Sequence, residues 1–300
     1  MAFYEQREKL VMMNQGEIGL KGRMDIQDLK VTFGRKGNLV EAVSGISLHV
    51  NPGEFVSIVG PSGCGKSTLL NAVAGFVKPS GGKVLLDGKE IKGPGADRGM
   101  VFQQYSLFPW MSVRKNVEFG LKMAGKERNA RESAARTLLG LAGLLAFENH
   151  YPDQLSGGMR QRVGIVRALA TSPQVLLMDE PFGALDAQTR VVMQEILTNM
   201  WQRFRLSVLF ITHDIDESIF LSDRLYVMTA RPGKIKAEIE IPLPRPRVPE
   251  MADSAEFLKL RHELHTLIRE ESLRAMGGEL KEGLGGFDTE VGPKGVQALI

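Results

Sequence analysis

The sequence predicts an α/β fold built on a mainly parallel β-sheet, with an antiparallel β edge and an inserted α-helical subdomain. Short apolar runs alternate with helix-period segments along most of the chain, which is the pattern of strands joined by crossover helices. Several runs are continuously apolar, as expected for strands that are buried on both faces, and the earliest strands are expected to form the antiparallel edge. The predicted strands are residues 26–33, 46–50, 55–59, 84–86, 175–178, 208–211 and 225–228.

One region interrupts this alternation and predicts the helical insertion. Residues 113–123 and 128–145 are rich in Ala, Leu, Arg and Glu, and no strand pattern lies between them. We therefore expect a helical subdomain over about residues 106–158. It would be inserted into a main domain of residues 24–240, preceded by an N-terminal extension of residues 1–23.

The core pattern fades near residue 240. Residues 241–252 are rich in prolines, which lack amide donors, so this stretch predicts a stiff linker. Beyond it, apolar side chains recur at helical spacing at Phe257, Leu260, Leu264 and Leu267. We expect one amphipathic helix over about residues 253–274 and a mobile, Gly-rich tail after it. The region 253–300 is either a regulatory or dimer-supporting appendage or a solvated extension.

The composition is that of a globular protein and limits its partners. With 300 residues, 43% hydrophobic and 24% charged, the chain is expected to form one large domain plus an appendage, and it is not largely disordered. A net charge of +3 does not imply a nucleic-acid partner. No apolar stretch reaches the ~20 residues that cross a bilayer, and no secretory signal is visible, so we expect a cytoplasmic location. A single cysteine, Cys64, fits a reducing compartment.

A glycine-rich loop follows the predicted strand 55–59 and opens a helical run. Residues 60–67 fit the pattern GxxxxGK followed by Ser or Thr, a loop whose backbone amides surround a β-phosphate at a helix N-terminus. Lys66 is expected to neutralise the β- and γ-phosphates of ATP, and the Ser67 hydroxyl is expected to ligate Mg²⁺. The expected nucleotide-binding residues in this loop are Gly60, Pro61, Ser62, Gly63, Cys64, Gly65, Lys66, Ser67 and Thr68.

Two acidic residues end the predicted strand 175–178. Asp179 is expected to hold Mg²⁺ through water, and Glu180 is expected to polarise the attacking water as a general base. Two acidic residues after an apolar strand would alone suggest a helix N-cap. Together with the phosphate loop, they predict the second half of an ATP-hydrolysing site.

A second glycine-rich element, Leu155-Ser156-Gly157-Gly158-Met159, also opens a helical run. Ser156 and the amides of Gly157 and Gly158 are expected to form an anion site at the helix N-terminus. The first loop already surrounds the α- and β-phosphates. We therefore expect the second element to contact the γ-phosphate of a nucleotide held by another subunit, which predicts a head-to-tail dimer.

These motifs, in this order, resemble those of the ATPase subunits of ATP-binding-cassette (ABC) transporters, over about residues 24–240. The resemblance implies a P-loop NTPase fold of the RecA-like kind and ATP hydrolysis. It also implies roles for four further residues: Gln103 as the Q-loop residue on magnesium, Asp186 in the D-loop, His213 as the switch histidine on the γ-phosphate, and Phe33 as the aromatic that stacks on adenine. Phe33 could instead be a core residue at a strand end.

Two positions depart from the common family pattern. Met159 stands where Gln is usual, but Ser156 and both glycines are intact, so hydrolysis is still expected. Phe33 stands where Tyr is common, which keeps the stacking surface and loses a hydroxyl.

The sequence around these motifs, including Phe108-Pro109-Trp110, Tyr151-Pro152 and residues 212–217, is most similar to that of importer ATPases of the nitrate, sulfonate, taurine and bicarbonate group. The resemblance implies a second copy or a paralogous ATPase subunit as dimer partner, two transmembrane permease subunits, an indirectly coupled solute-binding protein, and a place on the cytoplasmic face of the membrane. Phe108 and Trp110 would either line a groove for a permease helix or pack inside the helical insertion. A soluble ABC ATPase of DNA repair or ribosomes, or an exporter subunit, remains the alternative.

Overall fold

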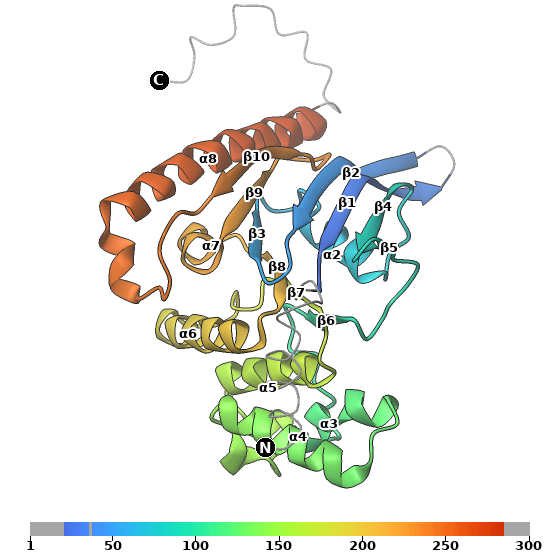
Figure 1. Cartoon of the computed structure of the whole chain (residues 1–300). Helices are drawn as coiled ribbons and strands as arrows, with labels where there is room; N and C mark the ends of the chain where they lie inside the picture. Colours follow the sequence, from blue (N-terminus) through green and yellow to red (C-terminus); the bar gives the residue numbers. More distant parts are fainter. Residues whose placement is uncertain (1–20, 36–37, 285–300) are drawn as a thin grey trace, which may run out of the picture.

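The computed structural model describes residues 21–35 and 38–284, which form two β-sheets with helices around them (Figure 1). The larger sheet has the strand order β10-β9-β3-β8-β7-β6, in which all strands are parallel except the edge strand β10. Its strands are β3 (Phe55–Val59), β6 (Arg98–Val101), β7 (Val175–Asp179), β8 (Ser207–Ile211), β9 (Arg224–Met228) and β10 (Ile235–Glu240). The predicted α/β fold class is confirmed.

The parallel strands are buried on both faces, which explains their continuous apolar sequences. In β3, Val56 and Ile58 pack in one apolar cluster together with α2 (Lys66–Ala74). Phe55 and Val59, which point to the opposite face, pack in a second cluster with residues of the helices on that side. Those helices are α5 (Gly157–Ala170), α6 (Ala187–Phe204), α7 (Ile215–Leu221) and α8 (Ala255–Leu284).

The early strands form a sheet of their own instead of the edge of the parallel sheet. This antiparallel sheet has the order β2-β1-β4-β5. It packs its apolar face against the cluster that contains α2, so the two sheets share one core. The antiparallel edge of the larger sheet is formed by β10. Neither β10 nor β6 was predicted from the sequence. The strands are β1 (Met24–Arg35), β2 (Asn38–Val50), β4 (Gly81–Leu86) and β5 (Lys89–Glu90).

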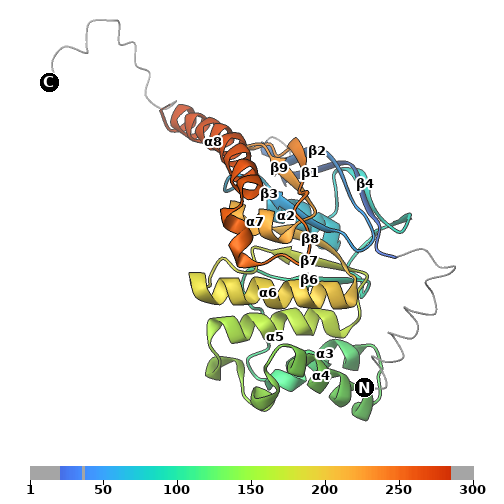
Figure 2. The ribbon, with the colours of Figure 1, turned by 60° about the vertical axis from the view of Figure 1, so that its left-hand side comes forward.

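The predicted helical insertion is present and lies to one side of the sheets, next to α5 (Figure 2). Its helices are α3 (Val113–Met123) and α4 (Arg128–Leu141), followed by short 3₁₀ turns η1 (Leu145–Phe147) and η2 (Pro152–Gln154). The buried Asn116 side chain donates to the carbonyls of Phe108, Met111 and Ser112, which fixes the entry loop on α3. The limits 106–158 of the subdomain stay a prediction.

The proline-rich stretch after β10 packs against the larger sheet and its helices. Ile241 and Leu243 are buried in the core cluster, and the side chains of Arg245 and Arg247 reach into the body of the protein. We call residues 241–253, which end in the 3₁₀ helix η3 (Pro249–Asp253), the strap. The strap is therefore a packed element, whereas its prolines had suggested a linker between separate parts.

Helix α8 is docked on the main domain. Phe257 and Leu264 are 1% and 0% exposed. The carboxylate of Glu271, also buried, accepts hydrogen bonds from the Ala230 amide and pairs with Lys236. The alternative of a solvated extension is therefore wrong for residues 255–275. The predicted N-terminal extension up to residue 20 and the tail from residue 285 lie outside the described residues.

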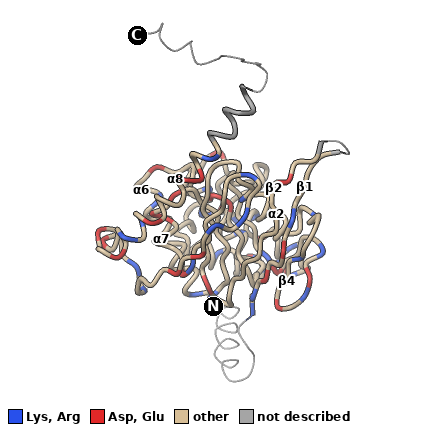
Figure 3. Tube along the Cα trace, turned by 90° about the horizontal axis from the view of Figure 1, so that it is seen from above, with Lys and Arg blue, Asp and Glu red and all other residues tan. Residues whose placement is uncertain are grey.

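Charged residues of both signs are interspersed along the chain trace, including α6, α7 and α8 (Figure 3). Ion pairs can therefore form between neighbouring helices, and one of them joins Arg261 on α8 to Asp216 on α7. Among the helices of the described residues, none is long and apolar enough to cross a membrane.

One carboxyl group lies inside this core. Glu217 on α7 is 4% exposed, accepts hydrogen bonds from the Thr212 hydroxyl and from the Gln194 side chain, and has Asp214 and Arg190 nearby. Burial raises its pKa to about 7, because the charged form loses its water. The group ties α7 to the loop that follows β8.

The docking of α8 predicts a difference between two leucines on the same helix. Leu264→Ala removes a fully buried side chain and leaves a cavity, so we expect a loss of about 2–5 kcal/mol in the free energy of unfolding. Leu273, which is 60% exposed, is the matched control, and Leu273→Ala should cost less than about 0.5 kcal/mol. Chemical denaturation of both variants measures this, and equal midpoints would show that α8 is not docked.

The pKa of Glu217 predicts a pH-dependent stability. Because its pKa is raised in the folded state, the folded protein holds the proton between its ordinary pKa of 4.5 and about 7 while the unfolded chain releases it. The contribution of Glu217 to stability is therefore lost as pH rises through this window. The Glu217→Gln variant cannot ionise at this position. Its free energy of unfolding should therefore rise relative to that of wild type by roughly 2 kcal/mol between pH 5 and 8. Denaturant titrations measure this difference in the free energy of unfolding, and a difference that stays constant over this pH range would contradict the raised pKa.

Candidate functional site

The predicted phosphate loop connects β3 to α2. Lys66 is the first residue of α2, and its side chain is 5% exposed. Its ammonium group donates to the carbonyl oxygens of Gly60 and Pro61 at 2.8 and 2.9 Å. The loop thus curls around the Lys66 ammonium, and Ser62 and Gly63 at its tip are exposed.

A close approach of two backbones explains why this loop needs glycine at position 65. Gly65 has φ of 103°, in the left-handed region, and a Cβ atom there would lie 2.6 Å from the carbonyl oxygen of Ala42. Any side chain would therefore push the loop away from β2. The tight turn lets α2 begin at once, with its first amides directed at the loop.

Ser67 and Asp179 meet at the mouth of the loop. The Ser67 hydroxyl donates to Asp179 Oδ1 at 3.0 Å, although the two residues are far apart in sequence. Burial raises the pKa of Asp179 above its ordinary value, the bond from Ser67 lowers it, and the neighbouring Glu180 raises it again. A hydroxyl and a carboxylate are hard oxygen donors of the kind that Mg²⁺ prefers.

Glu180 lies at the centre of a polar cluster. Its Oε2 atom lies 3.0 Å from His213 Nδ1 and 3.4 Å from Gln103 Nε2, which donates to it. Glu180 follows β7, His213 follows β8 and Gln103 follows β6, and these three strands are adjacent. The structure therefore brings together Glu180, His213 and Gln103 at the edge where Lys66, Ser67 and Asp179 also lie.

The backbone at Glu180 has an unusual conformation. Its φ is 41°, a region that a non-glycine residue enters at a cost of roughly 1–2 kcal/mol. The Glu180 amide donates to the carbonyl of Ile211, and its carbonyl accepts from the Gly183 amide. These bonds hold the turn that aims the carboxylate at His213.

The second glycine-rich element lies away from the phosphate loop. Ser156 caps α5, and its hydroxyl accepts a hydrogen bond from the Met159 amide at 3.4 Å. Helix α5 and helix α2 lie on opposite faces of the larger sheet (Figures 1 and 2). Within the described part of the chain, no hydrogen bond joins Ser156, Gly157 or Gly158 to the phosphate loop.

Asp186 is likewise engaged locally. Its carboxylate caps α6 by accepting bonds from the Thr189 amide and hydroxyl at 2.9 and 2.7 Å, and these bonds lower its pKa. The residue is exposed at the surface. Its contact with nucleotide stays a prediction.

The two aromatic predictions have different outcomes. Phe33 on β1 is 45% exposed, so it is not a core residue, and its ring is free to stack on a base. Phe108 packs against Phe119 of α3 with ring centroids 4.6 Å apart, whereas Trp110 is 70% exposed. Trp110 also borders a hollow of about 520 Å³ together with Arg114, Lys115 and Lys122.

Sequence reasoning missed the residues that hold the His213 loop. Thr212 donates to Glu217, and its hydroxyl oxygen accepts from the Asp214 amide at 3.0 Å. Asp214 in turn pairs with Arg190 of α6 at 2.7 Å. The acidic run around Asp214 was visible in the sequence, but its partners on α6 are far away in the chain.

The donor set fits Mg-ATP. Lysine and backbone amides are available for phosphates, and Ser67, Asp179 and Gln103 are available for the metal ion. In the described residues there is no cluster of three His, Cys, Asp or Glu side chains that could cage a metal by itself. Mg²⁺ usually takes one or two protein carboxylates and completes its shell with phosphates and water, a role that Asp179 and Ser67 fit.

Comparisons with known proteins agree with this chemistry. The family model for ABC transporters matches residues 43–183. The nitrate import ATP-binding protein NrtD of Synechocystis is 50% identical over 253 residues, covering 82% of this chain and 95% of that protein. The taurine import ATP-binding protein TauB of Rhizobium johnstonii is 49% identical over 248 residues, covering 80% and 94%.

A solved structure extends the likeness to three dimensions. The dimeric structure of an ATP-binding cassette in a post-hydrolysis state, bound to ADP and Pi, is similar with a TM-score of 0.65 and 32% identity. The match covers 73% of this chain and 98% of that one. Identity of about half over nearly the whole length of curated relatives establishes the family. The chain belongs to the ATP-binding subunits of ABC transporters, and it is an ATPase with the P-loop NTPase fold.

Proposed function

We propose that this subunit couples the hydrolysis of Mg-ATP to the import of a small anion of the nitrate, sulfonate, taurine or bicarbonate type. One observation carries the catalytic part: Glu180, His213 and Gln103 meet at the mouth of the phosphate loop. The solute class rests on the relatives named for nitrate and taurine import. No residue of this subunit needs to touch the solute.

Each residue of the cluster has a distinct task in hydrolysis. Lys66 exchanges its loop carbonyls for the β- and γ-phosphates, and Ser67, Asp179 and Gln103 hold the metal side of the nucleotide. Magnesium, when bound, supplies charge neutralisation on the phosphates. Glu180 accepts the proton of the attacking water as a general base. His213 orients Glu180 through Nδ1 and contacts the γ-phosphate.

A second subunit completes the site. The anion-binding end of α5, with Ser156, Gly157 and Gly158, is remote from the phosphate loop of its own chain. A head-to-tail dimer of two copies, or of this chain and a paralogue, would put each such end against the nucleotide held by the other subunit. ATP binding then closes the dimer, and hydrolysis opens it.

The partners in the membrane are two permease subunits, and a solute-binding protein is coupled through them. The exposed Trp110 and the hollow of about 520 Å³ beside it offer a place for a short permease helix. The subunit would then sit on the cytoplasmic face of the membrane, held by these contacts. The main domain is proposed to span residues 24–240.

Glu180→Gln tests the catalytic assignment. The amide keeps the size of the carboxylate and loses its basicity, so turnover should fall by about 100-fold or more while ATP still binds. The variant should accumulate as an ATP-bound dimer, and uptake should stop in vesicles that contain the permease subunits. Phosphate release and size-exclusion chromatography measure the first two effects. Glu195→Gln, at an exposed position on α6, is the matched control, and near wild-type turnover in Glu180→Gln would overturn the assignment.

Ser156→Arg tests the sharing of the site between subunits. The larger side chain blocks the anion site of α5, so ATP-dependent dimerisation and turnover should be lost. Binding of ATP to the phosphate loop should persist, because Ser156 does not touch that loop in its own chain. Met159→Gln in the same element is the control and should keep wild-type turnover. Cooperative hydrolysis by Ser156→Arg would show that the element does not meet the nucleotide.

A further inference from the structure

Helix α7 directly follows His213 and determines where this side chain lies. Asp214 is the N-cap of α7: its Oδ1 accepts from the Glu217 amide at 3.0 Å, and its own amide donates to Thr212. Residues 212–217 are thus one hydrogen-bonded unit. Any shift of α7 would move His213 relative to Glu180.

A helix as short as α7, residues Ile215–Leu221, does not hold its own position. Isolated helices of fewer than ~12 residues are marginal in water, so placement depends on contacts with the rest of the protein. Its two ends carry free amides and free carbonyls, which must find partners. The Asp214 side chain caps the N-terminal end, whereas the C-terminal carbonyls find partners in the strap. The first turn of α7 is also contacted by α8, through the side chain of Asp216.

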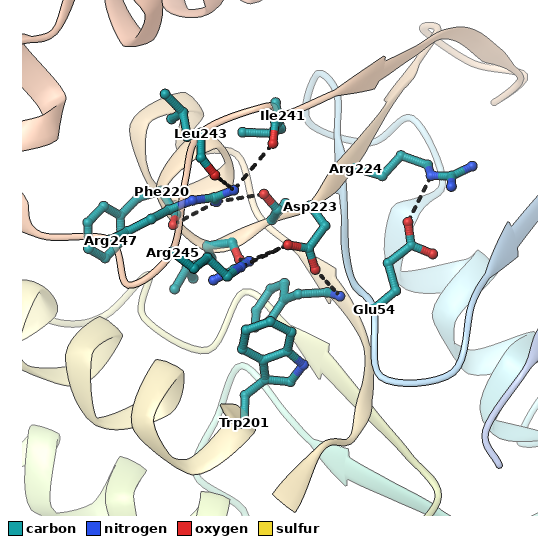
Figure 4. A network of polar contacts seen from close by, with 12 residues as sticks. Glu54, Trp201, Phe220, Asp223, Arg224, Ile241, Leu243, Arg245 and Arg247 are labelled. Carbon is teal, nitrogen blue, oxygen red and sulfur yellow. Dashed lines mark hydrogen bonds and ion pairs between the residues drawn. The ribbon is translucent and has the colours of Figure 1, made fainter. Parts of the chain in front are cut away.

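The C-terminal end of α7 is bound by Arg247 of the strap (Figure 4). Nη1 of Arg247 donates to the carbonyls of Ile219, Phe220 and Ser222 at 2.8, 3.0 and 2.6 Å. Nη2 donates to strap carbonyls of Ile241 and Leu243 at 3.4 and 3.3 Å. A single guanidinium therefore joins the strap to the last turn of α7.

The charge of Arg247 suits this position. The side chain is 6% exposed, and burial lowers its pKa to about 10, which still leaves it charged near neutral pH. The C-terminus of a helix carries partial negative charge, so a cation there is favourable. Carbonyl oxygens accept all five hydrogen bonds of Nη1 and Nη2, and the buried Nε has no hydrogen-bond partner in the described part of the chain. No carboxylate pairs with Arg247 among the ion pairs of the described residues.

Arg245 fixes the strap next to this contact. It donates to the Leu221 carbonyl at 2.6 Å, pairs with Asp223 at 2.8 Å, and stacks its guanidinium over the Trp201 ring at 4.2 Å (Figure 4). Asp223 Oδ2 also accepts from the Phe55 amide of β3 at 2.9 Å. The strap is therefore anchored to α6 and to the strand that leads into the phosphate loop.

The N-terminal end of α7 is bound by Arg261 of α8. Nε and Nη2 of Arg261 donate to the two oxygens of Asp216 at 2.6 and 2.9 Å, a bidentate pair on the first turn of α7. The guanidinium also lies over the ring of the buried Phe257, 5.1 Å from its centroid. Arg261 is thus held in place by the docked part of α8.

We propose that the strap and the start of α8 form a positioning element for the switch histidine. Arg247 and Arg261 hold α7 at its two ends and so keep His213 within hydrogen-bond distance of Glu180. This inference rests on the proposed role of His213. It makes Arg247 and Arg261 positioning residues that never touch the nucleotide.

The first test is steady-state hydrolysis by Arg261→Met and Arg247→Lys in the complete chain. Met keeps the aliphatic stem over Phe257 and loses the pair with Asp216, while Lys keeps a cation but cannot span both sets of carbonyls. We expect kcat to fall on the order of three- to tenfold with KM for ATP unchanged, because the phosphate loop is not altered. Arg269→Met, an exposed arginine of α8, is the matched control and should keep wild-type kcat.

A double-mutant cycle separates positioning from general destabilisation. In a His213→Ala background, measured as single-turnover phosphate release, Arg261→Met should have no further effect, since the residue it positions is absent. The charge-reversed pair Asp216→Arg with Arg261→Asp should restore most of the lost kcat. Equal losses in both backgrounds, or a wild-type kcat in Arg261→Met and Arg247→Lys, would overturn the proposal.

The same cycle distinguishes this proposal from the proposed function. Wild-type kcat in His213→Ala alone would refute the role of His213 in hydrolysis. An impaired His213→Ala with unimpaired arginine variants would leave that role intact and refute only the positioning element. Thermal unfolding of each variant, compared with Arg269→Met, identifies any that is unfolded. If Arg261→Met is unfolded, the charge-reversed pair decides.

Discussion

The alignment of four parallel strands is the constraint on which the site depends. Ile58 of β3 pairs with Ile211 of β8, Ile211 with Asp179 of β7, and Met178 with Val101 of β6. The residues that follow these positions therefore leave the sheet at one edge and at one level. The register of the strands thus determines where the residues that follow them lie, and it brings together Lys66, Glu180, His213 and Gln103. A slip of one strand would separate them.

This constraint explains how much of the site the sequence could predict. The phosphate loop, Asp179 and Glu180 each follow a continuous apolar strand, and local pattern was sufficient to find them. Gln103 follows β6, a strand with the weak sequence Arg-Gly-Met-Val, so only its place among the motifs identified it. The edge strand β10 was missed for a similar reason, since its alternating polar residues resemble a surface segment.

The strap was misread for a different physical reason. Prolines exclude helices and central strands, so the stretch predicted a stiff linker. A buried arginine whose partners are backbone carbonyls leaves no trace in the sequence, because every residue has a carbonyl. The apolar residues Ile241 and Leu243 were the available signal, since their alternation with prolines places both on one side of an extended chain.

A buried cation held only by carbonyls is costly to desolvate, and the position of Arg247 shows what offsets that cost. The last carbonyls of α7 would otherwise be buried without partners, since the strap covers them, and each such group costs about 1–3 kcal/mol. A neutral amide side chain has two N–H donors, whereas a guanidinium has five, and Nη1 and Nη2 of Arg247 reach both the carbonyls at the end of α7 and those of the strap. The strap can therefore cover the end of α7 only with a donor such as Arg247, and Arg247 can be buried only where these carbonyls accept its hydrogen bonds. It follows that the helix behind His213 is completed by residues that come after the last strand, β10.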